Sequence, residues 1–199
     1  MSRFSFNYLG IFFIIISFLS FFNILYSYYF NLYLNIDTYI ITLFISLIIG
    51  AILLLKKKID KKITIYEKII IVIIGYILLP IIISIPYYLS IYNISLIDCY
   101  FEAISGFTST GFTIIENIKH LDESLIIWRS TSQWIGGIYF LFSIVLLTDI
   151  FDNSLKKSLT NFISLNTSEV FKQSFKILIL YTTLTFVIFI VLNIIDIRS

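Results

Sequence analysis

Long apolar runs separated by short polar and basic segments make up most of this chain. Five runs are long enough to cross a bilayer, at residues 4–29, 39–55, 69–88, 125–147 and 175–195. Each is expected to be helical, because lipid offers no hydrogen-bond partner to a free backbone N–H or C=O group. The pattern therefore predicts an all-α integral membrane protein with five transmembrane helices.

One further helix is predicted to be too short to cross. Ser95 and Asp98 have the spacing of a helix N-terminal capping pair, and the helix they begin is expected to run to about Gly106. It would be about 16 Å long, whereas the hydrocarbon core is about 30 Å thick. The uncharged loop Thr-Ser-Thr-Gly-Phe-Thr follows it, at residues 108–113. These features predict a re-entrant pore helix and a filter loop between the third and fourth spans.

The composition supports a membrane protein and excludes several kinds of site. Hydrophobic residues make up 59% of the chain, charged residues make up 13%, and the mean hydropathy is +0.98. A single cysteine, Cys99, excludes an internal disulfide, and a single histidine, His120, excludes a His-pair metal site. Because the spans hold almost no ionisable groups, we expect no enzyme and no catalytic residues. The net charge of +2 gives no indication of nucleic-acid binding.

The distribution of lysine and arginine predicts the orientation. Eleven of the fourteen basic residues lie inside if Arg3, the lysines of 56–68 and those of 156–176 are cytoplasmic. Only Lys119, Arg129 and Arg198 then lie outside. We therefore expect a multi-pass protein of the cytoplasmic (inner) cell membrane, with a cytoplasmic N-terminus, an external re-entrant segment and an external C-terminus.

The predicted loop has the chemistry of a cation filter. The C-terminus of the short helix carries about half a negative charge, and pointing it at the membrane centre favours a partly dehydrated cation. The carbonyl and hydroxyl oxygens of the loop can replace the water around an ion. Gly111 can adopt a backbone conformation that residues with a Cβ avoid, so successive carbonyls can converge, and Phe112 is expected to wedge the loop against neighbouring helices. Alternatively, Ser-Thr-Gly is an ordinary turn between two interfacial helices.

Several motifs resemble the first pore repeat of the TrkH/KtrB (Trk/Ktr/HKT) potassium uptake family. They are Phe-Glu-Ala-Ile-Ser-Gly-Phe-Thr-Ser-Thr-Gly-Phe-Thr at 101–113, Trp-Arg-Ser at 128–130 and Gln-Trp-Ile-Gly-Gly at 133–137. The resemblance implies a potassium-conducting subunit, with potassium as its transported substrate and no covalently bound cofactor. The filter carbonyls would be those of Ser109, Thr110, Gly111 and Phe112, with potassium at Thr110 and Gly111. It also implies cytoplasmic nucleotide-binding regulatory subunits as partners.

Six residues are expected to support the loop: Glu102, Gly106, Thr108, Arg129, Gly136 and Gly137. Either Glu102 and Arg129 form an ion pair that fixes the pore helix, or Arg129 simply extends to water. The two glycines of the fourth span either allow a close helix approach or form a gating hinge. Ile138-Tyr139 stands where many relatives have another small residue, which predicts looser packing there.

Smaller signals carry structural expectations only. Pro80 and Pro86 remove two backbone donors from the third run, so we expect a bend near its outer end. His120 is expected in an exposed loop, and Cys99 is expected to be a small packing residue of the pore helix.

One loop cannot enclose a pore. Family members thread four pore loops from one chain, whereas this chain has one. We expect a two-helix lead-in at 1–65, a membrane-pore-membrane repeat at 66–150, and at 151–199 a cytoplasmic connection with the first helix of an incomplete second repeat. We favour an N-terminal fragment of a split or longer pore over a homotetramer. A non-conducting membrane protein that interacts with a full-length pore is the alternative function.

Overall fold

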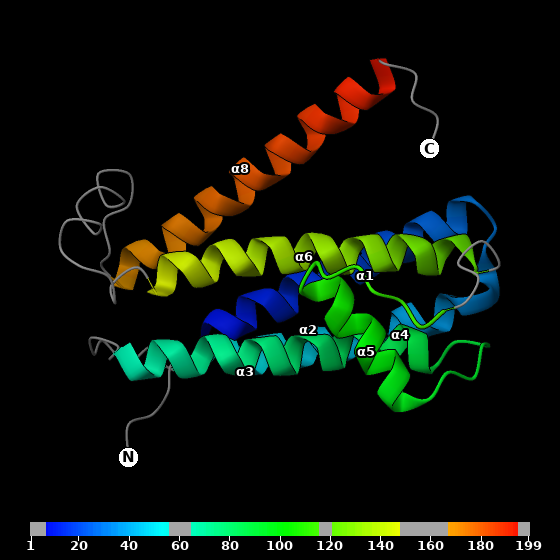
Figure 1. Cartoon of the computed structure of the whole chain (residues 1–199), viewed down its shortest axis with the longest axis horizontal. Helices are drawn as coiled ribbons and strands as arrows, with labels where there is room; N and C mark the ends of the chain where they lie inside the picture. The colour runs from blue at the N-terminus through cyan, green and yellow to red at the C-terminus, as the bar shows by residue number, and fades with distance from the viewer. Residues whose placement is uncertain (1–6, 56–64, 116–120, 148–166, 195–199) are drawn as a thin grey trace. The chain divides into compact units, whose positions relative to one another are not determined.

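The computed structural model describes residues 7–55, 65–115, 121–147 and 167–194, and every regular element among them is helical. In chain order the helices are α1 (Asn7–Tyr29), the short 3-10 helix η1 (Tyr33–Asn35), α2 (Ile36–Leu55), α3 (Ile65–Ile83), α4 (Ile85–Tyr88), α5 (Leu96–Phe107), α6 (Glu123–Leu147) and α8 (Thr167–Ile194). They form two compact units, Met1–Tyr139 and Phe140–Ser199. The loop and its supports lie in the first unit (Figure 1).

Four segments are long and apolar enough to cross a membrane: Asn7–Tyr29, Tyr33–Leu55, Tyr66–Tyr88 and Lys176–Ile194. They agree with four of the five predicted spans, and the second starts earlier than expected because η1 leads directly into α2. The fifth predicted span is the 25-residue helix α6, which at about 38 Å has the length to cross. It is not among the four apolar segments, and its residues 129–133 are all polar. The all-α membrane class is confirmed, and a fifth span remains a prediction.

Part of the topology prediction lies outside the described residues, because ten of the basic residues do: Arg3, Lys56, Lys57, Lys58, Lys61, Lys62, Lys119, Lys156, Lys157 and Arg198. The expectation that His120 lies in an exposed loop also concerns a residue outside them.

The helices α1 and α2 form a close antiparallel pair. An added Cβ on Gly10 would lie 3.2 Å from the Gly50 carbonyl oxygen, and one on Gly50 would lie 3.1 Å from the Gly10 carbonyl oxygen. The Ser17 hydroxyl donates to the Leu43 carbonyl across the pair, at 3.2 Å. Small residues allow helix backbones to approach in a membrane, where burial of apolar surface cannot drive helix association. The lead-in is therefore a tightly packed hairpin.

The third apolar run breaks where its prolines predict a bend. The helix α3 ends at Ile83, Ser84 follows, and α4 begins at Ile85 with Pro86 in its first turn. The last carbonyls of a helix have no partner within it. That of Ile83 accepts a hydrogen bond from the Trp128 indole N–H of α6, at 2.9 Å. The break is thus tied to the helix that follows the loop.

The expectation of loose packing at Ile138-Tyr139 is wrong. Both side chains are buried, and Tyr139 is fully so. The Tyr139 hydroxyl donates toward the carbonyls of Ile71 and Val72 in α3, at 3.3 and 3.0 Å. It reaches them over Gly75, where an added Cβ would overlap the phenol oxygen. A glycine in α3 therefore makes the room that a small residue in α6 would otherwise make.

A buried polar network joins the lead-in hairpin to the start of α6. The Asp122 carboxylate accepts from the Asn35 amide at 2.9 Å and from the Ser124 hydroxyl at 2.6 Å. Ser124 in turn bonds the Tyr39 hydroxyl at 2.9 Å, and its carbonyl accepts from the Asn23 amide at 3.1 Å. Polar side chains stabilise helix packing in a membrane by hydrogen-bonding across helices, because lipid supplies no hydrogen-bond partners. The network therefore sets where α6 begins relative to α1 and α2.

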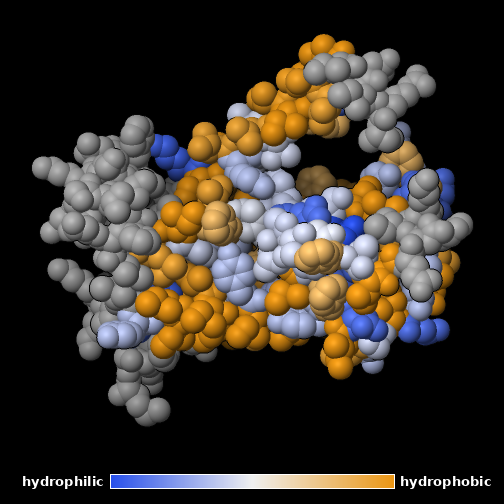
Figure 2. All heavy atoms as spheres, in the orientation of Figure 1, coloured by the Kyte–Doolittle hydropathy of each residue, from blue (hydrophilic) through white to orange (hydrophobic). Residues whose placement is uncertain are grey.

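Apolar side chains cover much of the face drawn in Figure 2, as expected for contact with lipid. On α1 alone, Phe18, Phe21, Phe22 and Leu25 are all about half exposed. A paler, more polar area interrupts this surface where the loop after α5 reaches it (Figure 2). That area belongs to the site described next.

Candidate ion-conducting loop

The short helix α5 begins where the sequence predicts. Ser95 caps it, since its hydroxyl oxygen accepts from the Asp98 backbone N–H at 3.2 Å and its hydroxyl donates to the Asp98 carboxylate at 2.7 Å. Its 12 residues span about 18 Å, which is too short to cross a bilayer. Figure 1 shows α5 ending against the middle of α6. One side of α5 is buried and includes Cys99, as expected, and Glu102.

The loop folds back over the last turn of α5. The Ser105 carbonyl accepts from the N–H groups of Thr110 and Gly111, at 3.0 and 3.4 Å, and the Ser109 N–H donates to the Gly106 carbonyl at 2.9 Å. Two loop residues have a left-handed backbone, Ser109 with φ of 55° and Gly111 with φ of 80°. The special conformation expected of Gly111 is therefore present, and Ser109 shares it without being a glycine.

The exposed side of the loop presents uncharged oxygens. Residues 108–113 are all exposed. The Thr108 hydroxyl donates to the Ile104 carbonyl at 2.8 Å and lies 2.6 Å from the Thr110 hydroxyl. Because a hydroxyl has one hydrogen, Thr110 must donate within that pair and keeps its own lone pairs free. Among the described residues, nothing donates to the carbonyls of Ser109 or Thr110. Such oxygens can replace the hydration shell of a cation.

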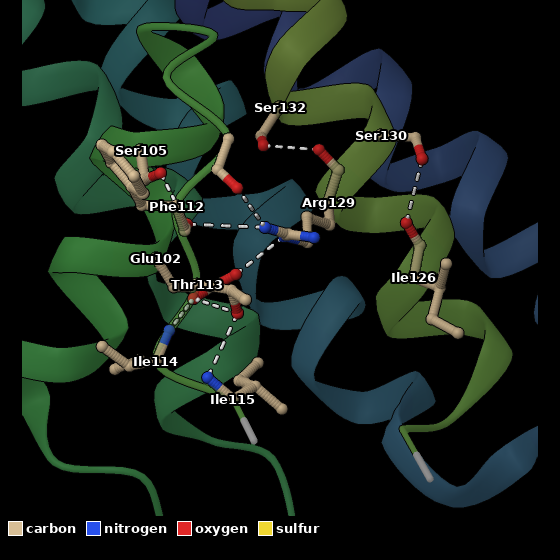
Figure 3. A network of polar contacts seen from close by, with 11 residues as sticks. Glu102, Ser105, Phe112, Thr113, Ile114, Ile115, Ile126, Arg129, Ser130 and Ser132 are labelled. Atoms are coloured by element: carbon tan, nitrogen blue, oxygen red, sulfur yellow. Dashed lines mark hydrogen bonds and ion pairs between the residues drawn. The ribbon is translucent and has the colours of Figure 1, made fainter. Parts of the chain in front are cut away.

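An ion pair lies behind the loop (Figure 3). Arg129 Nε is 2.7 Å from Glu102 Oε1, and their side chains are 15% and 2% exposed. The two atoms do not meet hydrogen-bond geometry, so the contact is electrostatic. The other Glu102 oxygen accepts from the Thr113 hydroxyl at 3.0 Å and from the Ile114 N–H at 3.3 Å. Of the two alternatives for Arg129, the ion pair is therefore the one present.

The Arg129 guanidinium also reaches the loop backbone. Its Nη2 donates to the carbonyls of Gly111 and Phe112, at 3.4 and 3.5 Å (Figure 3). The Glu102–Arg129 pair thus links three segments, namely α5, the loop and α6. We call this ion pair of Glu102 and Arg129 the brace. Because its two charges are opposite and lie together, the brace places no net charge behind the loop oxygens.

Two glycines let the end of α5 pack against α6. An added Cβ on Gly106 would overlap the Ser132 hydroxyl, and one on Gly136 would overlap the Phe107 carbonyl. Gly137 is half-buried one position further along α6. Since α6 continues as a regular helix through both glycines, close packing is the better account of Gly136 than a hinge.

Replacing Gly136 with alanine should push α5 away from α6. The added methyl group meets backbone rather than a flexible side chain, so we expect destabilisation of about 1–3 kcal/mol. Thermal unfolding of the purified protein in detergent measures this change. Ser130→Thr is the control, because it adds a methyl group at an exposed position of the same helix, and an equal loss of stability in both variants would contradict the packing role of Gly136.

Contrary to expectation, Phe112 does not wedge the loop against the helices of this chain. Its side chain is 67% exposed. The loop is held by the Phe112 backbone instead, because its carbonyl accepts from the Ser105 hydroxyl at 2.6 Å as well as from Arg129. Sequence reasoning missed Ser105, although it follows Glu102 by three residues and so shares its buried helix face.

Comparison with known proteins decides the family. The TrkH family model, described as a cation transport protein, matches residues 35–198. The chain belongs to the TrkH family. The resemblance in its motifs is thereby confirmed, and the match includes every residue of the loop and its brace.

Individual relatives are similar over shorter segments. An uncharacterized cation transporter of Methanocaldococcus jannaschii, MJ1485, is 47% identical over 58 residues, which are 29% of this chain and 12% of the relative. The potassium uptake protein TrkI of Halomonas elongata is 42% identical over 55 residues, 28% of this chain and 11% of TrkI. TrkG of Escherichia coli is 36% identical over 70 residues, 35% of this chain and 14% of TrkG. This TrkH-family chain thus spans 11–14% of these three relatives.

Proposed function

We propose that this chain supplies one selectivity-filter loop to a potassium-uptake pore in the cytoplasmic membrane. The observation that carries the proposal is the loop itself: uncharged oxygens on its exposed side, Gly111 at a φ of 80°, and the Glu102–Arg129 pair behind it. A pore helix too short to cross aims its negative end toward the membrane centre. Potassium is the transported substrate and binds at Thr110 and Gly111, and transport needs no catalytic step.

The membrane arrangement is part of the same proposal. Residues 1–65 form the lead-in, 66–150 form the first membrane-pore-membrane repeat with α6 as a span, and 151–199 hold a cytoplasmic connection and the first helix of an incomplete second repeat. The N-terminus is cytoplasmic, and the loop and the C-terminus are external. Exposed apolar residues of α5 and the loop, including Ile97, Phe101 and Phe112, provide a surface for neighbouring pore units.

Other chains or repeats complete the pore. A fragment of a split or longer protein is favoured over a homotetramer, because α8 follows the repeat as a further candidate span. Nucleotide-binding regulatory subunits on the cytoplasmic side are proposed from family membership alone.

Growth of a potassium-uptake-deficient bacterium at low potassium tests this function. The chain is expressed alone and together with the coding sequence that adjoins it, against an empty vector. Rescue only with the adjoining sequence is the expected result and supports a split or longer pore, whereas rescue by the chain alone supports a homo-oligomer. Rescue by neither, with the protein present in the membrane, would contradict the proposal and favour a non-conducting interaction protein.

A further inference from the structure

Ser105 makes hydrogen bonds to three residues of the loop that follows α5. Its side chain is buried, at 4% exposure. Its carbonyl accepts from two loop N–H groups, those of Thr110 and Gly111, and its hydroxyl donates to the Phe112 carbonyl at 2.6 Å. Three consecutive loop residues are thus fixed by one serine; Figure 3 shows its side-chain bond to Phe112.

The Phe112 carbonyl differs from the carbonyls before it. It accepts from Ser105 and also from Arg129 Nη2, at 3.5 Å. A carbonyl oxygen has two lone pairs, so both are directed to donors on α5 and α6. Among the described residues, the carbonyls of Ser109 and Thr110 have no such donors. The Gly111 carbonyl is intermediate, with one long contact of 3.4 Å to Arg129.

We propose that Ser105 is a positioning residue that turns the Phe112 carbonyl away from the ion path, so that the coordinating row ends at Gly111. This inference rests on the proposed function and changes its filter set, since Phe112 then contributes a structural rather than an ion-binding oxygen. Selectivity among cations depends on the number and field strength of the coordinating oxygens. The Ser105 hydroxyl therefore helps to set selectivity without touching the ion.

The side chain can be tested apart from the backbone. In Ser105→Ala the Ser105 carbonyl still accepts from Thr110 and Gly111, so the fold of the loop is kept. The Phe112 carbonyl keeps only the long Arg129 contact and becomes free to turn toward the ion path. Loss of one net hydrogen bond corresponds to a change of about two- to tenfold in the equilibrium between the two carbonyl orientations.

The measurement is the ratio of sodium to rubidium uptake by cells that express the chain with its adjoining coding sequence. We expect Ser105→Ala to change this ratio about two- to tenfold relative to the unchanged protein, at equal abundance in the membrane. Ser130→Ala is the matched control, because that hydroxyl bonds the Ile126 carbonyl within α6 at 3.1 Å and is exposed. The control should leave the ratio unchanged.

The outcomes separate this inference from the proposed function. Rubidium uptake with the same ratio in Ser105→Ala and the unchanged protein would overturn the inference alone. Absence of uptake by the unchanged protein would overturn the proposed function, and the inference with it. If Ser105→Ala does not accumulate in the membrane, the nearly isosteric Ser105→Cys, whose thiol is a weaker donor, should also change the ratio relative to the unchanged protein. An unchanged ratio there would equally overturn the inference.

Discussion

The Gly111→Ala substitution is expected to reduce rubidium uptake about five- to thirtyfold. Gly111 has a φ of 80°, and an added Cβ there would meet no atom within 4 Å, so the cost comes from the backbone and not from a clash. A left-handed conformation costs a residue with a Cβ about 1–2 kcal/mol, which lowers the ratio of the native loop to other loop conformations by that factor. Initial rates of uptake at equal membrane abundance measure the effect.

Ser109 provides the matched control within the same loop. It also has a left-handed backbone, with a φ of 55°, although it carries a Cβ. Ser109→Gly should therefore relieve strain and leave uptake intact or slightly higher. Uptake that tolerates Gly111→Ala as well as Ser109→Gly would contradict the role given to the loop conformation.

The second large effect concerns the Glu102–Arg129 pair. Removing one member of the pair leaves the other charge without its partner. In Arg129→Gln the unpaired charge is a carboxylate that is 2% exposed, and in Glu102→Gln it is the guanidinium beside the loop carbonyls. Breaking a buried pair in this way costs about 3–5 kcal/mol. We expect the double variant to be less destabilised than the sum of the two single changes, because neither charge is then left alone. Thermal unfolding in detergent supplies the four stabilities of the cycle.

An exposed carboxylate supplies the control for this cycle. Glu123 lies in the first turn of α6, and Glu123→Gln should cost less than about 1 kcal/mol, the usual contribution of a helix-terminal charge. If the loss of stability in the double variant equals the sum of the losses in the two single variants, the two charges do not stabilise each other. That result would contradict the structural role given to the Glu102–Arg129 pair.

Local features of the sequence were sufficient to predict the helix and the loop conformation. The Ser95 cap acts on a residue three positions away, and the length of α5 follows from the composition of one short segment. The left-handed φ of Gly111 could be expected because a residue without a Cβ adopts it at little cost. The break near Pro86 is equally local, because proline lacks the N–H that would continue the helix.

Features that depend on tertiary partners could not be predicted in the same way. Whether Arg129 pairs with Glu102 or extends to water depends on how α6 packs on α5, which Gly106 and Gly136 allow. The packing of Tyr139 depends on Gly75, a residue of another helix. The direction of the Phe112 carbonyl depends on a hydroxyl and a guanidinium from two elements, and no spacing in the sequence encodes it.

Rubidium flux into proteoliposomes tests the central claim most directly. The chain is purified alone and together with any protein that adjoining coding sequence encodes, and each preparation is reconstituted into vesicles with an outwardly directed potassium gradient. We predict rubidium uptake that external potassium competes away, that equal external sodium leaves largely intact, and that Gly111→Ala reduces about five- to thirtyfold. Uptake no greater than in protein-free vesicles, or uptake that Gly111→Ala leaves unchanged, would contradict the claim that this loop forms part of a potassium filter.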